Sequence, residues 1–258
     1  MDDKGSRLRE KLLSGKVTFG TCVDTHSPAT IEVAAYSGLD FVRVDYEHSW
    51  QRGDSPEHLM RAARVGGIVP LARVDNDENL IRKALEAGAE GVIVPHVSDE
   101  SDVKDIVSAA KFPPLGKRGY GSISFSGKWG TGKAAEWIAS SNSQLMVGVM
   151  IEEPEAIEKI DDITSVPGLD FLLFGPSDLS TILGIPGQTS HPRVQEALEK
   201  TVKSAKKHGK HVMIGVNYPW EEKVKQYTEL GCTLIELGHE LTILYSIWHS
   251  SLERLRNA

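Results

Sequence analysis

The sequence has few cysteines and no long apolar run. Cys22 and Cys232 are the only cysteines among 258 residues, so a framework of several disulfides is excluded. No apolar run approaches the roughly 20 residues of a membrane-spanning helix. The first five residues contain no apolar stretch of the signal-peptide type. These absences predict a cytoplasmic protein with no membrane partner.

Basic residues are not in excess either. The chain has 29 Lys and Arg against 36 Asp and Glu, which gives a formal net charge of −7. Nucleic-acid binding depends on clustered Lys and Arg, so no nucleic-acid partner is expected. The hydrophobic fraction of 40% and the charged fraction of 25% are ordinary for a globular protein. The composition therefore favours a folded enzyme domain.

What the sequence does contain is a regular alternation of short apolar runs and amphipathic segments. Near-continuous apolar runs are typical of buried parallel strands, and helix start and stop signals such as Ser27-Pro28 and Gly38 flank the segments between them. The runs span residues 17–23, 40–45, 68–74, 91–97, 145–151, 169–174, 211–216 and 233–237. Eight strand–helix units in about 250 residues predict a (β/α)₈ TIM barrel, with residues 1–258 as one barrel domain.

An open doubly wound sheet is the alternative fold. It would place a Gly-rich phosphate-binding turn after the first strand, whereas Val23 is followed by Asp24-Thr25-His26.

Two further segments stand out. Residues 112–136 form a long connection rich in Gly and Pro, which indicates either a functional cover or a flexible insertion. The apolar terminal segment, residues 241–256, packs either on its own barrel or on a partner subunit.

Polar groups follow five of the eight predicted strands. In a TIM barrel, catalytic groups collect at the C-terminal ends of the strands, so these groups are expected on one rim. They are Asp45-Tyr46-Glu47-His48, Arg73, Glu152-Glu153, Gly175-Pro176-Ser177-Asp178 and Gly238-His239-Glu240. No lysine stands at such a strand end, which disfavours a Schiff-base mechanism.

Glu152 and Asp178 are the candidate metal ligands. They follow adjacent strands, and a pair of carboxylates suits a hard divalent ion with open positions for substrate oxygens. Alternatively, each carboxylate is satisfied by a neighbouring Arg or by a helix N-terminus. The Gly175-Pro176-Ser177 segment is typical of a tight strand-to-helix turn, whose backbone N–H groups bind a substrate carboxylate or form an ordinary turn.

His48 and Arg73 are the candidate catalytic residues. His48 stands three residues after Asp45, so it is either a general base oriented by that carboxylate or a surface histidine. Arg73 either stabilises an enolate oxygen or forms an ion pair at the strand end with Asp45 or Asp75.

The order of these motifs resembles that of the HpcH/HpaI aldolase family, the metal-dependent class II pyruvate aldolases. The likeness extends from about Gly20 to Tyr245. The motifs that carry it are Asp45-x-Glu47-His48, Val94-Pro95, Phe112-Pro113-Pro114-x-Gly116-x-Arg118-Gly119, Ile151-Glu152, Gly175-Pro176-Ser177-Asp178-Leu179-Ser180 and His191-Pro192.

The resemblance implies a role for each candidate residue. Glu152 and Asp178 correspond to ligands of Mg²⁺, Mn²⁺ or Co²⁺, and Arg73 to the arginine that stabilises the enolate. His48 and Asp45 correspond to an acid–base dyad. The resemblance further implies that the turn of Gly175, Pro176 and Ser177 binds the pyruvate carboxylate. Glu86 lies near an acidic position that the family lends to a neighbouring subunit. The resemblance also implies that the last helix of the barrel is exchanged between subunits, usually in a hexamer.

The implied function is reversible cleavage of a 4-hydroxy-2-oxo acid into pyruvate and an aldehyde through a metal-bound pyruvate enolate. Four positions depart from the family pattern, namely Cys22, Tyr46, Met150 and His239. They are expected on the aldehyde side of the pocket, so the acceptor differs from the usual one. An oxaloacetate decarboxylase or another metal-enolate lyase, similar to macrophomate synthase, is the alternative. A barrel that binds a keto acid without turnover is a third.

Overall fold

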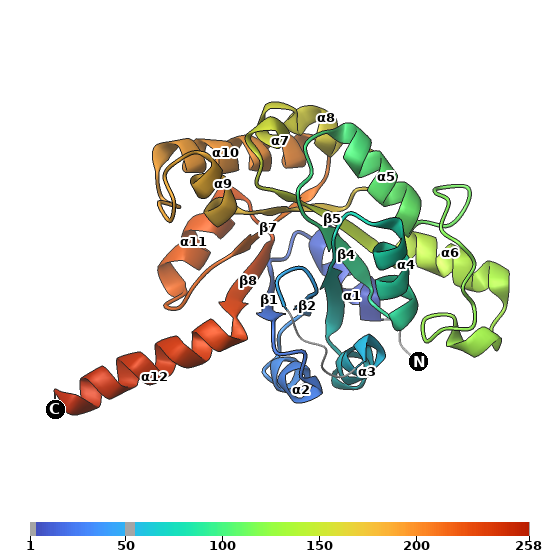
Figure 1. Ribbon diagram of the computed structural model, residues 1–258, viewed down its shortest axis with the longest axis horizontal. Helices are drawn as coiled ribbons and strands as arrows, with labels where there is room; N and C mark the ends of the chain where they lie inside the picture. The colour runs from blue at the N-terminus through green and yellow to red at the C-terminus, as the bar shows by residue number, and fades with distance from the viewer. Residues whose placement is uncertain (1–3, 50–54, 258) are drawn as a thin grey trace.

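The fold is described by a computed structural model that covers residues 4–49 and 55–257. Eight parallel strands close into a barrel in the order β1 to β8, with β8 paired to β1 (Figure 1). They are β1 Thr18–Val23, β2 Phe41–Asp45, β3 Val69–Arg73, β4 Gly91–Val94, β5 Met146–Ile151, β6 Phe171–Phe174, β7 His211–Gly215 and β8 Leu234–His239. Each predicted apolar run coincides with one strand to within three residues at either end. The predicted TIM barrel is confirmed.

The helices fall into an expected set and an unexpected set. The expected ones are α2 Pro28–Tyr36, α3 Pro56–Gly66, α4 Glu78–Ala87, α5 Glu100–Ala110, α10 Pro192–Lys207, α11 Glu221–Leu230 and α12 Glu240–Arg256. The others are α1 Lys4–Leu13, α6 Ala134–Gln144, α7 Pro154–Glu158, α8 Ile160–Ser165 and α9 Pro176–Ile182, with a 3₁₀ turn at Lys128–Gly130. Sequence signals explain the bounds of the first set. Pro28 and Pro56 occupy the first turns of their helices, and Gly67 and Gly88 end α3 and α4 in the left-handed conformation.

One end of the barrel is closed by apolar side chains. The first residues of several strands, such as Phe41 and Phe171, form a buried cluster with Leu8 and Leu12 of α1. Gly20 and Gly148 make room for the two rings, because a Cβ at either glycine would lie 2.3 Å from a ring carbon. Since the N-terminal ends of the strands are plugged in this way, the polar rim at their C-terminal ends is the open face.

The Gly- and Pro-rich connection lies away from that rim. Its Phe125 ring packs under Arg64, 4.2 Å from the guanidinium carbon, and the backbone N–H of Ser126 donates to the carbonyl of Glu86. These contacts are with the C-terminal ends of α3 and α4, beside the start of β4. Together with α6, the connection borders a cavity of about 540 Å³. The described structure therefore gives no support for a cover over this chain's own rim.

Helix α12 projects from the barrel and leaves an apolar face exposed (Figure 1). The exposed apolar side chains are Leu241, Leu244, Tyr245, Ile247, Trp248, Leu252 and Leu255. Of the two packing alternatives, the structure does not show packing of this face on its own barrel; the exchange of α12 between subunits remains a prediction. None of the helices within the described ranges has the length and apolarity that spanning a membrane requires.

Candidate active site

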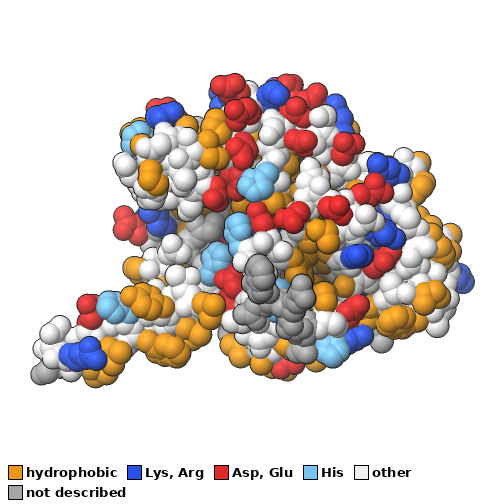
Figure 2. All heavy atoms as spheres, viewed as in Figure 1, with side chains coloured by type: hydrophobic (Ala, Val, Ile, Leu, Met, Phe, Trp, Pro, Cys, Tyr) orange, Lys and Arg blue, Asp and Glu red, His pale blue; other side chains and the backbone are white. Residues whose placement is uncertain are grey.

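The C-terminal rim carries carboxylates and imidazoles from neighbouring strands. Figure 2 shows acidic side chains with histidines among them in a band across the centre of one face. Two clusters make up the rim. The first comes from β2, β3 and the segments after β2, β4 and β5, and the second from β1, β2 and β8.

In the first cluster, Asp45 and Arg73 form a buried ion pair. The Asp45 carboxylate accepts from Arg73 Nε at 3.0 Å and from Nη2 of the same guanidinium. Arg73 Nη1 also lies 3.0 Å from Glu47 Oε2. Burial alone would raise the pKa of Asp45, but its hydrogen bonds and ion pair with Arg73 outweigh this effect and lower the pKa to about 2. Two carboxylates therefore hold the Arg73 guanidinium in one orientation, and its predicted strand-end pairing with Asp45 is confirmed.

Among the described contacts, none joins the His48 ring to the Asp45 carboxylate. The Asp45 Oδ1 atom accepts instead from the backbone N–H groups of Glu47 at 2.9 Å and His48 at 3.4 Å. The His48 side chain is 66% exposed, and its Nε2 lies 3.9 Å from Glu47 Oε2. Asp45 thus fixes the backbone that carries His48 but does not orient its ring. The predicted acid–base dyad stays a prediction.

Glu152 lies in a different electrostatic environment. It follows β5, is 2% exposed, and its Oε1 accepts from the backbone N–H of His96 at 2.9 Å. Burial raises the pKa of Glu152, and the negative charges of Asp178 and Glu47 raise it further, against the effect of His96. Among the described residues, no Lys or Arg forms an ion pair with this carboxylate. A buried carboxylate near a second acid, without a permanent cation, is what a divalent-metal site requires.

The Gly175 turn is shaped around Glu152. A Cβ at Gly175 would lie 2.9 Å from both Cβ and Oε2 of Glu152, so only glycine leaves this carboxylate its place. Helix α9 begins at Pro176, directly after this glycine, and Asp178 stands exposed in its first turn. The predicted strand-to-helix turn is present, and it brings Asp178 close enough to affect the pKa of Glu152.

His96 belongs to this cluster although the sequence reasoning assigned it no role. Its Nε2 lies 3.2 Å from Glu47 Oε1, and its Nδ1 lies 3.3 Å from Glu153 Oε1. Burial opposes protonation of His96, but Glu153, Glu152 and Glu47 together raise its pKa. His96 directly follows the Val94-Pro95 motif at the end of a strand, which is the signal that could have identified it.

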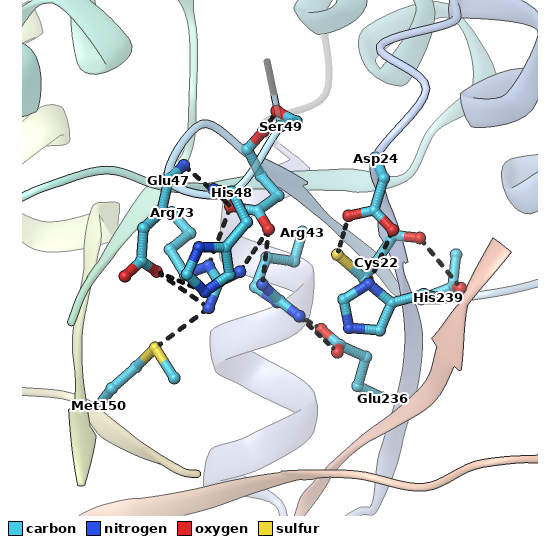
Figure 3. A network of polar contacts seen from close by, with 12 residues as sticks. Cys22, Asp24, Arg43, Glu47, His48, Ser49, Arg73, Met150, Glu236 and His239 are labelled. Atoms are coloured by element: carbon cyan, nitrogen blue, oxygen red, sulfur yellow. Dashed lines mark hydrogen bonds and ion pairs between the residues drawn. The ribbon is translucent and has the colours of Figure 1, made fainter. Parts of the chain in front are cut away.

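The second cluster lies across Arg43 from the first (Figure 3). Arg43 Nε and Nη2 donate to the two carboxylate oxygens of Glu236, each at 2.7 Å, and both side chains are buried. Next to this pair, Asp24 Oδ2 lies 2.7 Å from His239 Nδ1, and Cys22 Sγ lies 3.3 Å from Asp24 Oδ1. Of these five residues, the sequence reasoning singled out only Cys22 and His239, as departures from the family pattern.

The fold and this rim define a class of protein. A parallel barrel with converging acids, imidazoles and a fixed arginine at its C-terminal face is the arrangement of a TIM-barrel enzyme. The particular family follows from comparison with known proteins. The profile of the HpcH/HpaI aldolase/citrate lyase family matches residues 19–246.

Individual relatives agree with this match. The 2-keto-3-deoxy-L-rhamnonate aldolase of Escherichia coli K12 is 30% identical over 93% of this chain and 88% of its own length. The crystal structure of an HpcH/HpaI aldolase from Desulfitobacterium hafniense DCB-2 superimposes with a TM-score of 0.90, at 31% identity over 97% of both chains. That of a citrate synthase, SbnG, gives 0.87 at 32% identity, again over 97% of both chains.

The chain therefore belongs to the HpcH/HpaI aldolase/citrate lyase family. It is an enzyme of the lyase type, from a family of metal-dependent class II aldolases.

Proposed function

We propose that the protein reversibly cleaves a 4-hydroxy-2-oxo acid into pyruvate and an aldehyde, with Mg²⁺, Mn²⁺ or Co²⁺ bound by Glu152 and Asp178. The proposal rests on the contrast between two buried carboxylates: Asp45 is paired with Arg73, whereas Glu152 has no Lys or Arg partner among the described residues and lies 3.5 Å from the titratable His96. Oxygen ligands suit each of these ions. When bound, the ion would act as a Lewis acid on the keto acid.

Arg73 is the proposed oxyanion-binding residue. Its guanidinium is held from two sides by Asp45 and Glu47, so it needs no reorganisation when negative charge develops on a substrate oxygen. The proposed substrate-binding turn of Gly175, Pro176 and Ser177 starts α9 beside Glu152. The first N–H groups of a helix lack partners within the helix, and those of Ser177 and Asp178 are proposed to bind the pyruvate carboxylate.

His48 is the proposed proton acceptor. Asp45 positions it through the backbone, since the carboxylate accepts the N–H of His48 while its side chain remains exposed. An exposed imidazole above a fixed backbone can reach a substrate at the rim and exchange its proton with water.

The test is an assay with pyruvate, Mn²⁺ and a panel of aldehydes, with and without a chelator. We expect aldehyde-dependent consumption of pyruvate that the chelator abolishes and that Glu152→Ala with Asp178→Ala removes. Intact activity in this double variant would refute the metal assignment. Absence of turnover with every aldehyde, together with retained binding of pyruvate, would instead support a keto-acid-binding barrel.

A decarboxylase or another metal-enolate lyase is the second candidate. The observation in its favour is the unusually polar second cluster, where Arg43 and Glu236 occupy the barrel interior. Met150 replaces a commonly polar residue and places its sulfur 3.6 Å from Arg73 Nη1. Loss of oxaloacetate without aldehyde, at a rate above that of aldol turnover, would favour this candidate.

We further propose a cytoplasmic homo-oligomer, a hexamer in the form usual for the family, in which α12 packs on a second copy of the chain. The exposed apolar face of α12 supports this, and the two free cysteines fit a reducing compartment. Analytical ultracentrifugation tests the assembly. Leu244→Glu with Trp248→Glu is expected to lower the molecular mass of the particle, whereas Arg254→Glu, a charge change on the same helix, is not.

A further inference from the structure

The second cluster brings together sulfur, nitrogen and oxygen donors at the ends of two adjacent strands. Cys22 lies in β1, Asp24 directly follows that strand, and His239 ends β8. Because β1 and β8 pair in the closed barrel, with Cys22 opposite His239, the His239 side chain meets Asp24 although the two are 215 residues apart. Cys22 Sγ lies 3.3 Å from Asp24, and Asp24 lies 2.7 Å from His239.

The spacing of these donors matches a transition-metal site. Ligand atoms of Cys22, His239 and Glu236 all lie within 4.8 Å of one another, and so do those of Cys22, Asp24 and Asp45. Zinc binds sulfur at about 2.3 Å and nitrogen or oxygen at about 2.0–2.2 Å, which places its ligands within such separations of one another. Cys22 belongs to both groups, with His239 in the first and Asp24 in the second, and Asp24 Oδ2 lies 2.7 Å from His239 Nδ1.

The two carboxylates deeper in the barrel are already neutralised. Glu236 is bidentate to Arg43, and Asp45 is paired with Arg73. Asp24 is paired with His239 instead of an arginine, and His239 is neutral when it ligates a metal, so Cys22, Asp24 and His239 remain the candidate donors. A thiolate with one carboxylate balances the charge of a divalent ion. The Asp24 and His239 side chains are 24% and 40% exposed, so an ion can enter from the rim.

The backbone around these donors is fixed by a further carboxylate. Glu240 Oε1 accepts the N–H groups of Asp24 at 2.8 Å and Thr25 at 2.7 Å. The Thr21 hydroxyl donates to the carbonyl of Gly238 at 2.8 Å, which ties β1 to the residue before His239. Such outer contacts orient ligands and are typical of metal sites.

We propose that Cys22, Asp24 and His239 form a second metal site that is selective for Zn²⁺-like ions and separate from the Glu152–Asp178 site. The thiolate ligand discriminates against Mg²⁺, which prefers oxygen donors only. Binding forms a metal–sulfur bond and releases the thiol proton of Cys22 to solvent. Three protein ligands leave a coordination position free for water or a substrate group at the rim.

The test is a Co²⁺ titration of the full-length, metal-stripped protein, followed by absorption spectroscopy. Thiolate coordination gives an intense sulfur-to-cobalt charge-transfer band that oxygen ligands cannot give. We expect one equivalent of this band, retained in excess Mg²⁺ and displaced by Zn²⁺. A wild-type titration with no such band would overturn the proposal.

Variants assign the band to its ligands. Since the chain has two cysteines, Cys22→Ser is expected to abolish the band and Cys232→Ser, at the other buried cysteine, to keep it. The partly exposed His239→Ala is expected to weaken Co²⁺ binding by at least about 10-fold. A band that survives Cys22→Ser or that is unaffected by His239→Ala contradicts the proposed ligand set.

A final variant separates this inference from the proposed function. Glu152→Gln with Asp178→Asn removes the candidate ligands of the other site, and we expect the charge-transfer band to persist in it. Loss of the band there would show that the two sites are not independent and would refute the separate site. The charge-transfer band and the Co²⁺ affinity can both be measured without aldolase activity. The test of the second metal site therefore remains valid even if the proposed function is wrong. Circular dichroism confirms that each variant is folded.

Discussion

Asp45 and Glu152 are both buried carboxylates at the rim, but their surroundings shift their pKa values in opposite directions. The pKa of Asp45 is lowered to about 2, since the ion pair with Arg73 outweighs the effect of burial. The pKa of Glu152 is raised, first by burial and then by the neighbouring acids Asp178 and Glu47. Asp45 therefore has a permanent cationic partner within the chain, whereas the described residues offer Glu152 only the titratable His96 at 3.5 Å. In the proposed function, the difference separates a residue that positions the site, Asp45, from a residue proposed to bind the metal, Glu152.

The largest effect is expected from Arg73→Ala. Removal of the guanidinium leaves Asp45 buried and unpaired, which costs about 3–5 kcal/mol of unfolding free energy. Loss of a donor to a developing oxyanion lowers kcat by about 10²–10³-fold. Urea unfolding and the pyruvate–aldehyde assay measure the two losses. Arg61→Ala is the matched control, because Arg61 packs on Phe125 away from the rim. Equal stability of the two variants would remove the claim that Asp45 depends on Arg73.

The next test compares the two carboxylates directly in metal-free protein. Asp45→Asn is expected to lower the unfolding free energy by about 2.5 kcal/mol, because the pKa of Asp45 is lowered from 3.8 to about 2 and each pKa unit corresponds to about 1.4 kcal/mol. Glu152→Gln is expected to leave the stability of metal-free protein unchanged or to raise it, because it removes a buried charge without a cation.

Added metal should close most of the gap between these two variants, because Asp45→Asn keeps its response to the metal. At 100 times its dissociation constant, a ligand stabilises the folded state by about 2.7 kcal/mol, and we expect Glu152→Gln to lose this gain with Mn²⁺. Thermal unfolding with and without Mn²⁺ measures it. Equal responses to Mn²⁺ in wild type and Glu152→Gln would contradict the metal-binding role.

The eight strands and the main rim positions could be predicted from the sequence. Continuous apolar runs mark strands buried on both faces, and the polar residue that ends each run marks the rim. The start of α9 after Gly175 was predicted, but the short helices α7 and α8 were not, because five or six residues carry too little periodicity.

The side-chain partners at the rim were harder to predict. His48 is three residues from Asp45, but the carboxylate is taken by Arg73 from the neighbouring strand. The Asp24–His239 contact depends on closure of the barrel between β8 and β1, which no local pattern shows. Adjacency in sequence identifies candidates, and strand pairing decides which of them meet.

A smaller effect is expected from Gly175→Ala. The added methyl group displaces the Glu152 carboxylate by contact at 2.9 Å, so metal affinity and kcat fall, by about 10-fold, while the fold is retained. Isothermal titration with Mn²⁺ measures the affinity. Gly132→Ala is the matched control, since a Cβ there meets nothing within 4 Å. Unchanged Mn²⁺ affinity in Gly175→Ala would show that Glu152 is not constrained by this turn.

The smallest and most specific effect is the pH dependence of stability. Asp45 has a lowered pKa, so its contribution is fully present above the unfolded pKa of 3.8 and is lost as pH falls toward about 2. Glu152 has a raised pKa, so in metal-free protein its protonated form favours folding below the unfolded pKa of 4.5, and this contribution is lost as pH rises through the folded pKa. The contribution of Asp45 therefore makes the unfolding free energy rise with pH between about 2 and 3.8. The contribution of Glu152 makes it fall with pH above 4.5.

Urea unfolding of wild type, Asp45→Asn and Glu152→Gln between pH 2 and pH 7 resolves the two slopes. The difference in unfolding free energy between wild type and Asp45→Asn should shrink as pH falls toward 2, and that between wild type and Glu152→Gln should grow with pH. With Mn²⁺ the Glu152 slope should change sign, because a metal binds the ionised carboxylate and competes with protons. A Glu152 slope that is the same with and without Mn²⁺ would mean that this carboxylate is buried for a reason other than holding a cation.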